Sequence, residues 1–291
     1  MLHEEGPNPA GPALVLQARR HLSPMSVCDC SGLTPSSPED PAVHQVPAQP
    51  APPAPPLPPR NRSQLFDPDE VRRAIPLLEE SGQVFEVRIL KGVPETGWGK
   101  PRTFAGYFTP EDVQELIKGL GTFKAWSGVY ITLNSVDPAL RARSAGRIKE
   151  AEATASDGDI VRRRFLLLDF DPVRPSGISS SDFELQLAME RAKSVRGFLD
   201  EELDWPAPLL ALSGNGAHLL YRVDLPAEDS IVGSVLRSVA TLYSDKLVEV
   251  DRSVFSPAQL TKLYGTMACK GDSIKERPHR LSRILEVPDV H

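Results

Sequence analysis

Apolar and polar residues alternate in the first half of the chain in a way that predicts short strands separated by helices. Strands are expected at residues 84–90, 103–108 and 128–133. Thr109 is a favourable N-cap and Pro110 suits the first helical position, so a helix is expected from there to Gly119 or Gly121. Further helices are expected near residues 71–78, interrupted or started at Pro76, and from Asp137 through Arg147.

The second half opens with a continuous apolar run, Phe165 to Leu168, which is typical of a buried strand. Strands are predicted at residues 161–169, 208–212, 218–223 and 248–251. Helices are predicted at residues 183–199, 231–242 and 258–263. Because hairpin-like strand pairs are mixed with helices, the pattern predicts an α+β fold with antiparallel pairing.

A proline-rich leader precedes these elements. Eleven prolines fall between Pro35 and Pro59, and proline removes the amide donor that helices and central strands need. We therefore expect residues 1–62 to be a disordered, polyproline-like leader and residues 63–291 to form the folded domain. Within that domain, residues 63–160 are expected to form an N-terminal α/β unit and residues 161–291 a second unit.

Composition narrows the class of protein. The chain has 291 residues, is 40% hydrophobic and has a formal net charge of −6, which argues against a protein that coats nucleic acid non-specifically. Cys28, Cys30 and Cys269 match no common zinc spacing and are expected to be free thiols. The apolar runs are too short to span a bilayer, so the sequence predicts a cytoplasmic protein with no membrane partner.

Two acids end the buried strand of the second half. Asp169 and Asp171 alternate with Phe170, so both carboxylates should project from one face. Adjacent carboxylates repel each other unless a cation lies between them, and hard oxygen ligands suit Mg²⁺ or Mn²⁺. The alternative is that both acids cap a turn, since Pro172 follows.

A glycine-containing turn separates the next two strands, with the sequence Ser213-Gly214-Asn215-Gly216-Ala217-His218. Glycines allow main-chain amides to approach an anion closely, and Ser213 and His218 could add a hydroxyl and an imidazole. The alternative is an ordinary Asn-Gly hairpin in which His218 is only packed.

A third acid and a basic tail complete the candidate chemistry. Asp251 ends a short β-branched strand, and it would complete a three-carboxylate site if that strand lay beside Asp169. From Arg252 to Arg283 there are seven Lys or Arg and two acids, a net charge of +5 in an acidic protein. Such a local reversal is typical of a polyphosphate or nucleic-acid site, although a solvated basic face is the alternative.

In this order and spacing, the segments resemble the catalytic domain of archaeo-eukaryotic primases, the primase–polymerase superfamily. Hydrophobic-Asp-x-Asp is matched by residues 168–171, Ser-Gly-x-Gly-x-His by residues 213–218, and hydrophobic-Asp by residues 250–251. The later Lys-Leu-Tyr-Gly-Thr and Arg-Pro-His-Arg stretches are similar to those of bacterial, plasmid and phage-borne members, which points to a mobile element. The resemblance covers about residues 64–287.

The resemblance implies an RRM-like antiparallel sheet that carries the acids and packs on the N-terminal unit. It implies that Asp169, Asp171 and Asp251 are catalytic and hold two Mg²⁺ or Mn²⁺ ions. The nucleotide-binding residues that it implies are Ser213, Gly214, Gly216, His218, Lys262, Lys270, Arg277 and Arg280.

The expected function is that of a metal-dependent DNA primase or polymerase, a nucleotidyltransferase of DNA replication. Its partners would be single-stranded DNA template and nucleoside triphosphates. The chain holds no Walker-type phosphate loop, so ATP-driven unwinding would come from a separate helicase or be absent. One alternative is a replication-initiator or defence-associated binding module that keeps the fold without polymerising. Another is a metal-dependent nuclease that uses the same acids.

Overall fold

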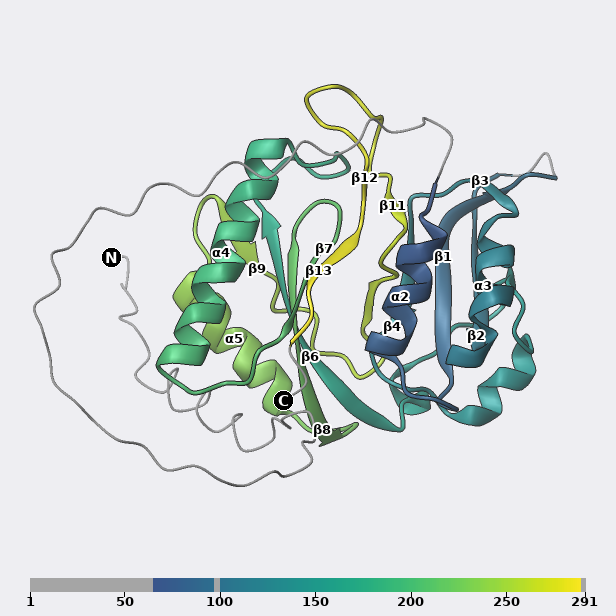
Figure 1. The fold of residues 1–291 in the computed structure, drawn as a ribbon, viewed down its shortest axis with the longest axis horizontal. Coiled ribbons are helices and arrows are strands. Elements are labelled where there is room, and N and C mark those ends of the chain that lie inside the picture. The colour runs from purple at the N-terminus through teal and green to yellow at the C-terminus, as the bar shows by residue number, and fades with distance from the viewer. Residues whose placement is uncertain (1–64, 97–99, 289–291) are drawn as a thin grey trace, which may run out of the picture.

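Two antiparallel sheets stand side by side in the computed structural model, which describes residues 65–96 and 100–288 (Figure 1). The α+β class predicted from the sequence is confirmed. The proline-rich leader of residues 1–62, with Cys28 and Cys30, lies outside the described residues. Among the described helices, none is both long enough and apolar enough to cross a membrane.

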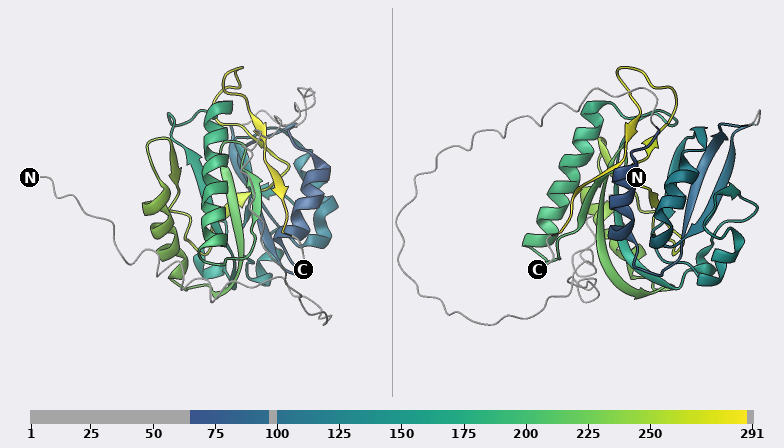
Figure 2. Two further views of the ribbon diagram at one scale, coloured as in Figure 1. Left: turned by 60° about the vertical axis from the view of Figure 1, so that its left-hand side comes forward. Right: turned by 45° about the vertical axis from the view of Figure 1, so that its right-hand side comes forward.

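The first sheet has the strand order β10-β4-β1-β2-β5, with β3 paired to β1. Its strands are β1 (Phe85–Pro94), β2 (Arg102–Phe108), β3 (Phe123–Ala125), β4 (Gly128–Thr132), β5 (Lys149–Glu150) and β10 (Leu260–Lys262). Helices α2 (Pro68–Leu78) and α3 (Val113–Leu120) lie next to each other against this sheet (Figure 2).

The helix ends in this unit follow local sequence rules. The side chain of Asp67 caps α2 by accepting from the amides of Asp69 and Glu70, at 3.0 and 3.2 Å. Pro76 lies inside the last turn of α2 and does not interrupt the helix. Thr109 and Asp112 form a capping box around the 3₁₀ turn η1 (Pro110–Asp112) that leads into α3. The helix predicted from Asp137 is shorter, a 3₁₀ segment η2 (Pro138–Arg143).

The second sheet has the order β13-β7-β8-β6-β9 and is antiparallel throughout. Its strands are β6 (Arg162–Pro172), β7 (Leu209–Leu212), β8 (Ala217–Pro226), β9 (Val248–Val250) and β13 (Arg283–Glu286). Helices α4 (Asp182–Glu201) and α5 (Ile231–Tyr243) cover the face that points away from the first sheet (Figure 1). The other face is left for the first sheet to cover.

The segment after β9 joins the two sheets. Residues 258–263 were predicted to be helical, and that prediction is wrong: Leu260 to Lys262 form β10, which pairs antiparallel with β4. The open edge of β4 supplies hydrogen-bond partners that outweigh the local helical pattern. The chain then forms the hairpin of β11 (Met267–Ala268) and β12 (Arg280–Leu281) before β13 returns to the second sheet.

One hydrophobic core runs through both sheets. Val87 and Ile131 of the first sheet belong to the same buried cluster as Phe165, Leu167 and Leu168 of β6. The apolar run predicted to be a buried strand is indeed buried, each of its residues being at most 2% exposed. The two sheets therefore share one close-packed interior.

A buried asparagine adds a polar link between the sheets. Asn134, which is 1% exposed, follows β4 and accepts from the amide of Arg164 in β6 at 2.7 Å. Its side-chain amide donates to the carbonyl of Pro257, just before β10, at 2.8 Å. One side chain thus fixes β6 and the approach to β10 against the end of β4.

We predict that Asn134→Ala lowers the free energy of unfolding by about 2–3 kcal/mol, because a buried donor and a buried acceptor lose their partners. Urea denaturation measures the change. Gln186→Ala is the matched control, since Gln186 is an exposed amide on α4 that bonds only Glu190, and we expect a change within about 0.5 kcal/mol. Equal effects of the two substitutions would contradict a role for Asn134 in joining the sheets.

Candidate active site

The strand β6 presents two aspartates to the face that the first sheet covers. Leu168 and Phe170 are fully buried, whereas Asp169 and Asp171 alternate with them and line a pocket on the opposite face. One carboxylate oxygen of Asp169, Oδ1, is buried and makes no hydrogen bond to the described residues, although it lies 3.3 Å from Nε2 of His218. A buried, unpaired carboxylate oxygen is costly unless a ligand satisfies it.

The strands next to β6 bring two more predicted residues beside Asp169. His218 of β8 is the direct cross-strand partner of Asp169. On the other side, Phe170 pairs with Val250 of β9, and the amide of Asp251 donates to the carbonyl of Asp169 at 2.9 Å. The carboxylate of Asp251 accepts from the amide of Ser253 at 2.7 Å. Among the described residues, no three His, Cys, Asp or Glu side chains converge closely enough to form a ready metal-binding group.

The pocket itself lies between the two sheets and has a volume of about 90 Å³. We call it the inter-sheet pocket. Pockets that enclose whole ligands have volumes of roughly 300 Å³ or more, so this one suits the charged end of a ligand. Six of the residues predicted from the sequence line it: Asp169, Asp171, Ser213, His218, Lys262 and Lys270.

The glycine-containing turn has a specific shape. The hydroxyl of Ser213 accepts from the amide of Gly216 at 2.9 Å, and Asn215 accepts from the amide of Ser180 at 2.9 Å. A Cβ on Gly216 would lie 2.3 Å from the carbonyl oxygen of Phe170, so a glycine is needed for β8 to start beside β6. Gly214 has a φ of +98° and faces Ala268 rather than the pocket.

Lys262 brings a positive charge into the pocket from the first sheet. It is 6% exposed, and its Nζ lies 4.3 Å from the centre of the Tyr130 ring, its cross-strand partner in β4. Gly128 leaves room for the ammonium group, because a Cβ there would be 2.5 Å from Nζ. Burial, and secondarily the charge of Lys270, lower the pKa of Lys262 to about 8. Within the described chain, no carboxylate forms an ion pair with this ammonium group.

The carboxylate pair is also under electrostatic strain. Burial and the charge of Asp169 raise the pKa of Asp171, and Arg174 and Lys270 partly offset that rise. Arg174 lies 3.3 Å from the Asp171 carboxylate. The inter-sheet pocket therefore holds carboxylates that repel each other and a lysine without an ion pair among the described residues. This combination is expected of a binding site for a metal ion and an anion.

The two arginines predicted to bind nucleotide lie away from the pocket lining, as do Gly214 and Gly216 of the turn. Arg277 forms a two-bond ion pair with Glu184 at 2.6 and 2.8 Å. Arg280 bonds Asp182 at 2.6 Å and the carbonyl of Ser180 at 2.7 Å. Both arginines hold the loop before α4 against the C-terminal hairpin, and that loop in turn bonds Asn215.

Other lining residues did not stand out in the sequence. Tyr130 and Thr261 line the pocket, yet Tyr130 is an ordinary strand residue and Thr261 lies in the segment predicted to be helical. Only the pairing of β10 with β4 brings them to the aspartates. No local pattern reveals such a pairing, because its two strands are more than a hundred residues apart in the chain.

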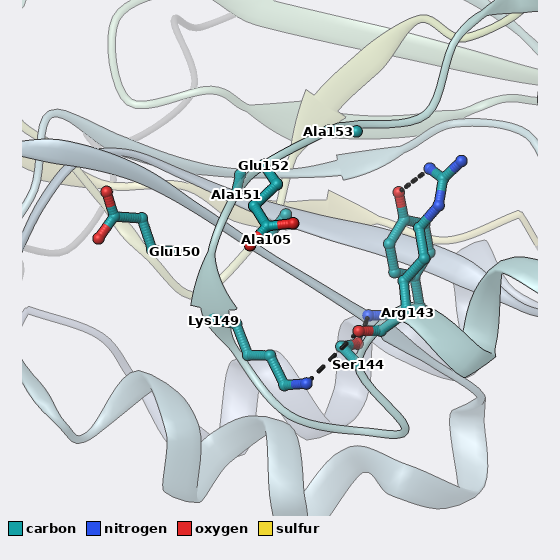
Figure 3. A pocket seen from close by; sticks show the side chains of 9 residues that line it. Ala105, Arg143, Ser144, Lys149, Glu150, Ala151, Glu152 and Ala153 are labelled. Atoms are coloured by element: carbon teal, nitrogen blue, oxygen red, sulfur yellow. Dashed lines mark hydrogen bonds between the residues drawn. The ribbon is translucent and has the colours of Figure 1, made fainter.

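A larger pocket of about 390 Å³ lies between β2, η2 and β5 (Figure 3). Its lining mixes the cations Arg143 and Lys149 with the acids Glu150 and Glu152. Arg143 donates to the hydroxyl of Tyr107 at 3.1 Å, and Lys149 reaches the carbonyl of Arg143 at 3.5 Å (Figure 3). The smaller inter-sheet pocket is the better candidate for chemistry, because it holds a buried lysine and a buried carboxylate oxygen that makes no hydrogen bond to the described residues.

We predict that Lys262→Met raises the free energy of unfolding at pH 7 by about 1–3 kcal/mol, because the folded protein no longer carries a buried charge. The folded pKa, about 8, lies below the ordinary value of 10.5. The unfolded chain therefore binds more protons between these pH values, and the wild type gains stability as pH rises through this window. The difference between variant and wild type should shrink accordingly from pH 7 to pH 10 in urea denaturation.

Lys118→Met is the matched control, since Lys118 is exposed on α3. Its difference from the wild type should not change with pH over the same window. A Lys262→Met difference that stays constant from pH 7 to pH 10 would contradict the buried charge.

A scan of the chain against models of known protein families finds no match, and a search of curated proteins finds no similar one. The chemistry assigned to the inter-sheet pocket therefore rests on its residues and their geometry.

Proposed function

We propose that this chain is a metal-dependent nucleotidyltransferase that acts as a DNA primase or polymerase. The observation that carries the proposal is the inter-sheet pocket, where two aspartates of one sheet face a buried lysine of the other. Phosphoryl transfer depends on positioning and on neutralising negative charge. Carboxylates that attract a divalent cation and a lysine that attracts a phosphate, gathered in one small pocket, meet both needs.

The topology of the second sheet supports an RRM-like core. Its first elements run β6-α4-β7-β8-α5-β9, and β8 lies between β7 and β6 in the sheet. This order is that of the split βαβ, or ferredoxin-like, arrangement. The helices cover one face, so the acid-bearing face is free to form a site with the N-terminal unit, as the primase resemblance implies.

The residues fit a divalent metal ion such as Mg²⁺ or Mn²⁺. Asp169 has a buried oxygen that accepts no hydrogen bond from the described residues, and the pKa of Asp171 is raised by burial and by repulsion from Asp169. A bound cation would be a partner for the Asp169 oxygen and would reduce the repulsion between the two carboxylates. Asp169 and Asp171 would hold it, and Asp251 would join them from the adjacent strand. When bound, two such ions would activate a 3′ hydroxyl and stabilise the leaving pyrophosphate.

The remaining residues suit the triphosphate. Lys262 and Lys270 bring positive charge to the pocket, and His218 and Ser213 bring polar groups from the strand and turn beside Asp169. The Lys262 ammonium lies between Gly128 and the Tyr130 ring, and no carboxylate of the described residues forms an ion pair with it. It is therefore available for a phosphate oxygen, which would favour its charged form.

The proposed partners are nucleoside triphosphates and a single-stranded DNA template, with a separate helicase supplying unwinding. A template needs only a local basic groove, so the net charge of −6 is compatible with it. A binding module would make the same triphosphate contacts, but it would not polymerise and would not need the aspartates for catalysis. Activity measurements therefore separate the two.

We predict that Mg²⁺ raises the unfolding free energy of the wild type by about 1.4 kcal/mol at ten times its dissociation constant. Asp171→Asn should be slightly more stable than wild type without metal, since a repelling charge is gone, and should gain little on adding Mg²⁺. Thermal melting with and without Mg²⁺ measures both effects. Asp224→Asn, an exposed aspartate of β8 paired with Arg162, should respond to Mg²⁺ like the wild type. Equal metal responses of both variants would contradict the site.

We predict that wild-type protein synthesises primers on single-stranded DNA with Mg²⁺ or Mn²⁺ and labelled ribo- or deoxynucleotides. Asp169→Asn and Asp171→Asn should each reduce product by about 10²–10³-fold, because charge stabilisation is lost, whereas Asp224→Asn should not. Nucleotide binding without product in any condition would favour the binding module. Shortened template would favour the nuclease.

A further inference from the structure

His218 is held by different kinds of group on its two ring nitrogens. Nδ1 lies 2.8 Å from the hydroxyl of Tyr264 and 3.4 Å from that of Thr261. Nε2 lies 3.3 Å from the Oδ1 of Asp169. The imidazole is 3% exposed, so these protein groups, rather than bulk water, decide which nitrogen carries the proton.

The two environments select one tautomer. An ionised carboxylate can only accept a hydrogen bond, so the nitrogen that faces Asp169 must carry the proton to avoid lone-pair repulsion. A hydroxyl can donate, so the nitrogen that faces Tyr264 can be the acceptor. A neutral imidazole carries one N–H. This arrangement favours the tautomer with its proton on Nε2, the nitrogen directed at the carboxylate side of the inter-sheet pocket, and with Tyr264 as the donor to Nδ1.

Tyr264 is itself rigidly placed. It is fully buried, and burial raises the pKa of its hydroxyl, which therefore keeps its proton. Leu263 donates from its amide to the carbonyl of Val129 at 3.1 Å, which continues the β10–β4 pairing up to Tyr264. Gly265 follows with a φ of +93°, and a Cβ there would lie 2.7 Å from the amide nitrogen of Val71. The close fit on both sides fixes the direction of the hydroxyl.

We propose that Tyr264 is a positioning residue that holds His218 as an Nε2–H donor aimed into the inter-sheet pocket, where it serves an anionic oxygen of the ligand. The identity of that oxygen as a triphosphate oxygen rests on the proposed function, whereas the tautomer does not. An N–H donor of fixed direction favours an anionic oxygen as its partner.

The chain offers a matched control for this tyrosine. Tyr221 lies in β8 of the second sheet, three residues after His218, and like Tyr264 it is buried, being 1% exposed. Its hydroxyl is buried without a hydrogen-bond partner. Tyr221→Phe and Tyr264→Phe therefore each remove one buried phenolic oxygen, but only the second removes a bond to His218.

The test is ¹⁵N NMR of histidine-labelled full-length protein, with the His218 signals assigned from a His218→Gln variant. The wild type should show a protonated Nε2 and an unprotonated, hydrogen-bonded Nδ1. In Tyr264→Phe the Nδ1 signal should move toward that of an unbonded nitrogen, or the proton should redistribute between the nitrogens. Tyr221→Phe should leave both signals unchanged. A wild type with its proton on Nδ1, or a Tyr264→Phe spectrum identical to wild type, would overturn the proposal.

The wild-type spectrum needs no variant, so the tautomer is tested even if Tyr264→Phe folds poorly. For folded variants, we predict that Tyr264→Phe weakens nucleoside triphosphate binding by about tenfold and that Tyr221→Phe leaves binding unchanged. An altered tautomer with unchanged triphosphate binding would refute the assigned role of His218 toward the ligand. Absence of triphosphate binding by the wild type would instead refute the proposed function and leave the tautomer assignment intact.

Discussion

The pairing of β10 with the edge of β4 is the interaction on which the site depends. It brings the chain that follows β9 back to the first sheet. The Lys262 ammonium therefore lies over the ring of Tyr130 and shares a pocket with the aspartates of β6. Continued to Leu263, the same pairing sets the hydroxyl of Tyr264 against His218. Without it, the two sheets would still carry acids and bases, but not in one pocket. Three cross-strand residue pairs thus bring two units together as one candidate active site.

The inter-sheet pocket reflects a conflict between folding and binding. Folding favours paired charges, yet among the described residues the buried Oδ1 of Asp169 makes no hydrogen bond, and the Lys262 ammonium lies over the ring of Tyr130 without an ion pair. Each such group destabilises the unliganded protein. The shared core and the Asn134 link offset this cost and keep the sheets together. A ligand with a cation and an anionic group would relieve both kinds of uncompensated charge.

The charges near the pocket divide into two functional groups. Lys262 and Lys270 line it, whereas Arg277 and Arg280 are engaged by Glu184 and Asp182 at the start of α4. The arginines therefore act on the pocket indirectly, through the loop that holds Asn215. Net charge along the tail does not distinguish these roles, because an ion pair depends on which acid lies opposite in space.

The sequence by itself determined most of the local structure: the alternation of strands, the cap at Thr109, the buried run of β6 and the side-by-side placement of Asp169 and Asp171 on one face. These follow from periodicity and capping, which act over a few residues. The tertiary structure decided the rest, including the strand at residues 260–262 where a helix was predicted, the neighbours of Asp169, and the partners of Arg277 and Arg280. Edge pairing and ion pairs join residues about a hundred positions apart, so their outcome is fixed only when the whole chain packs.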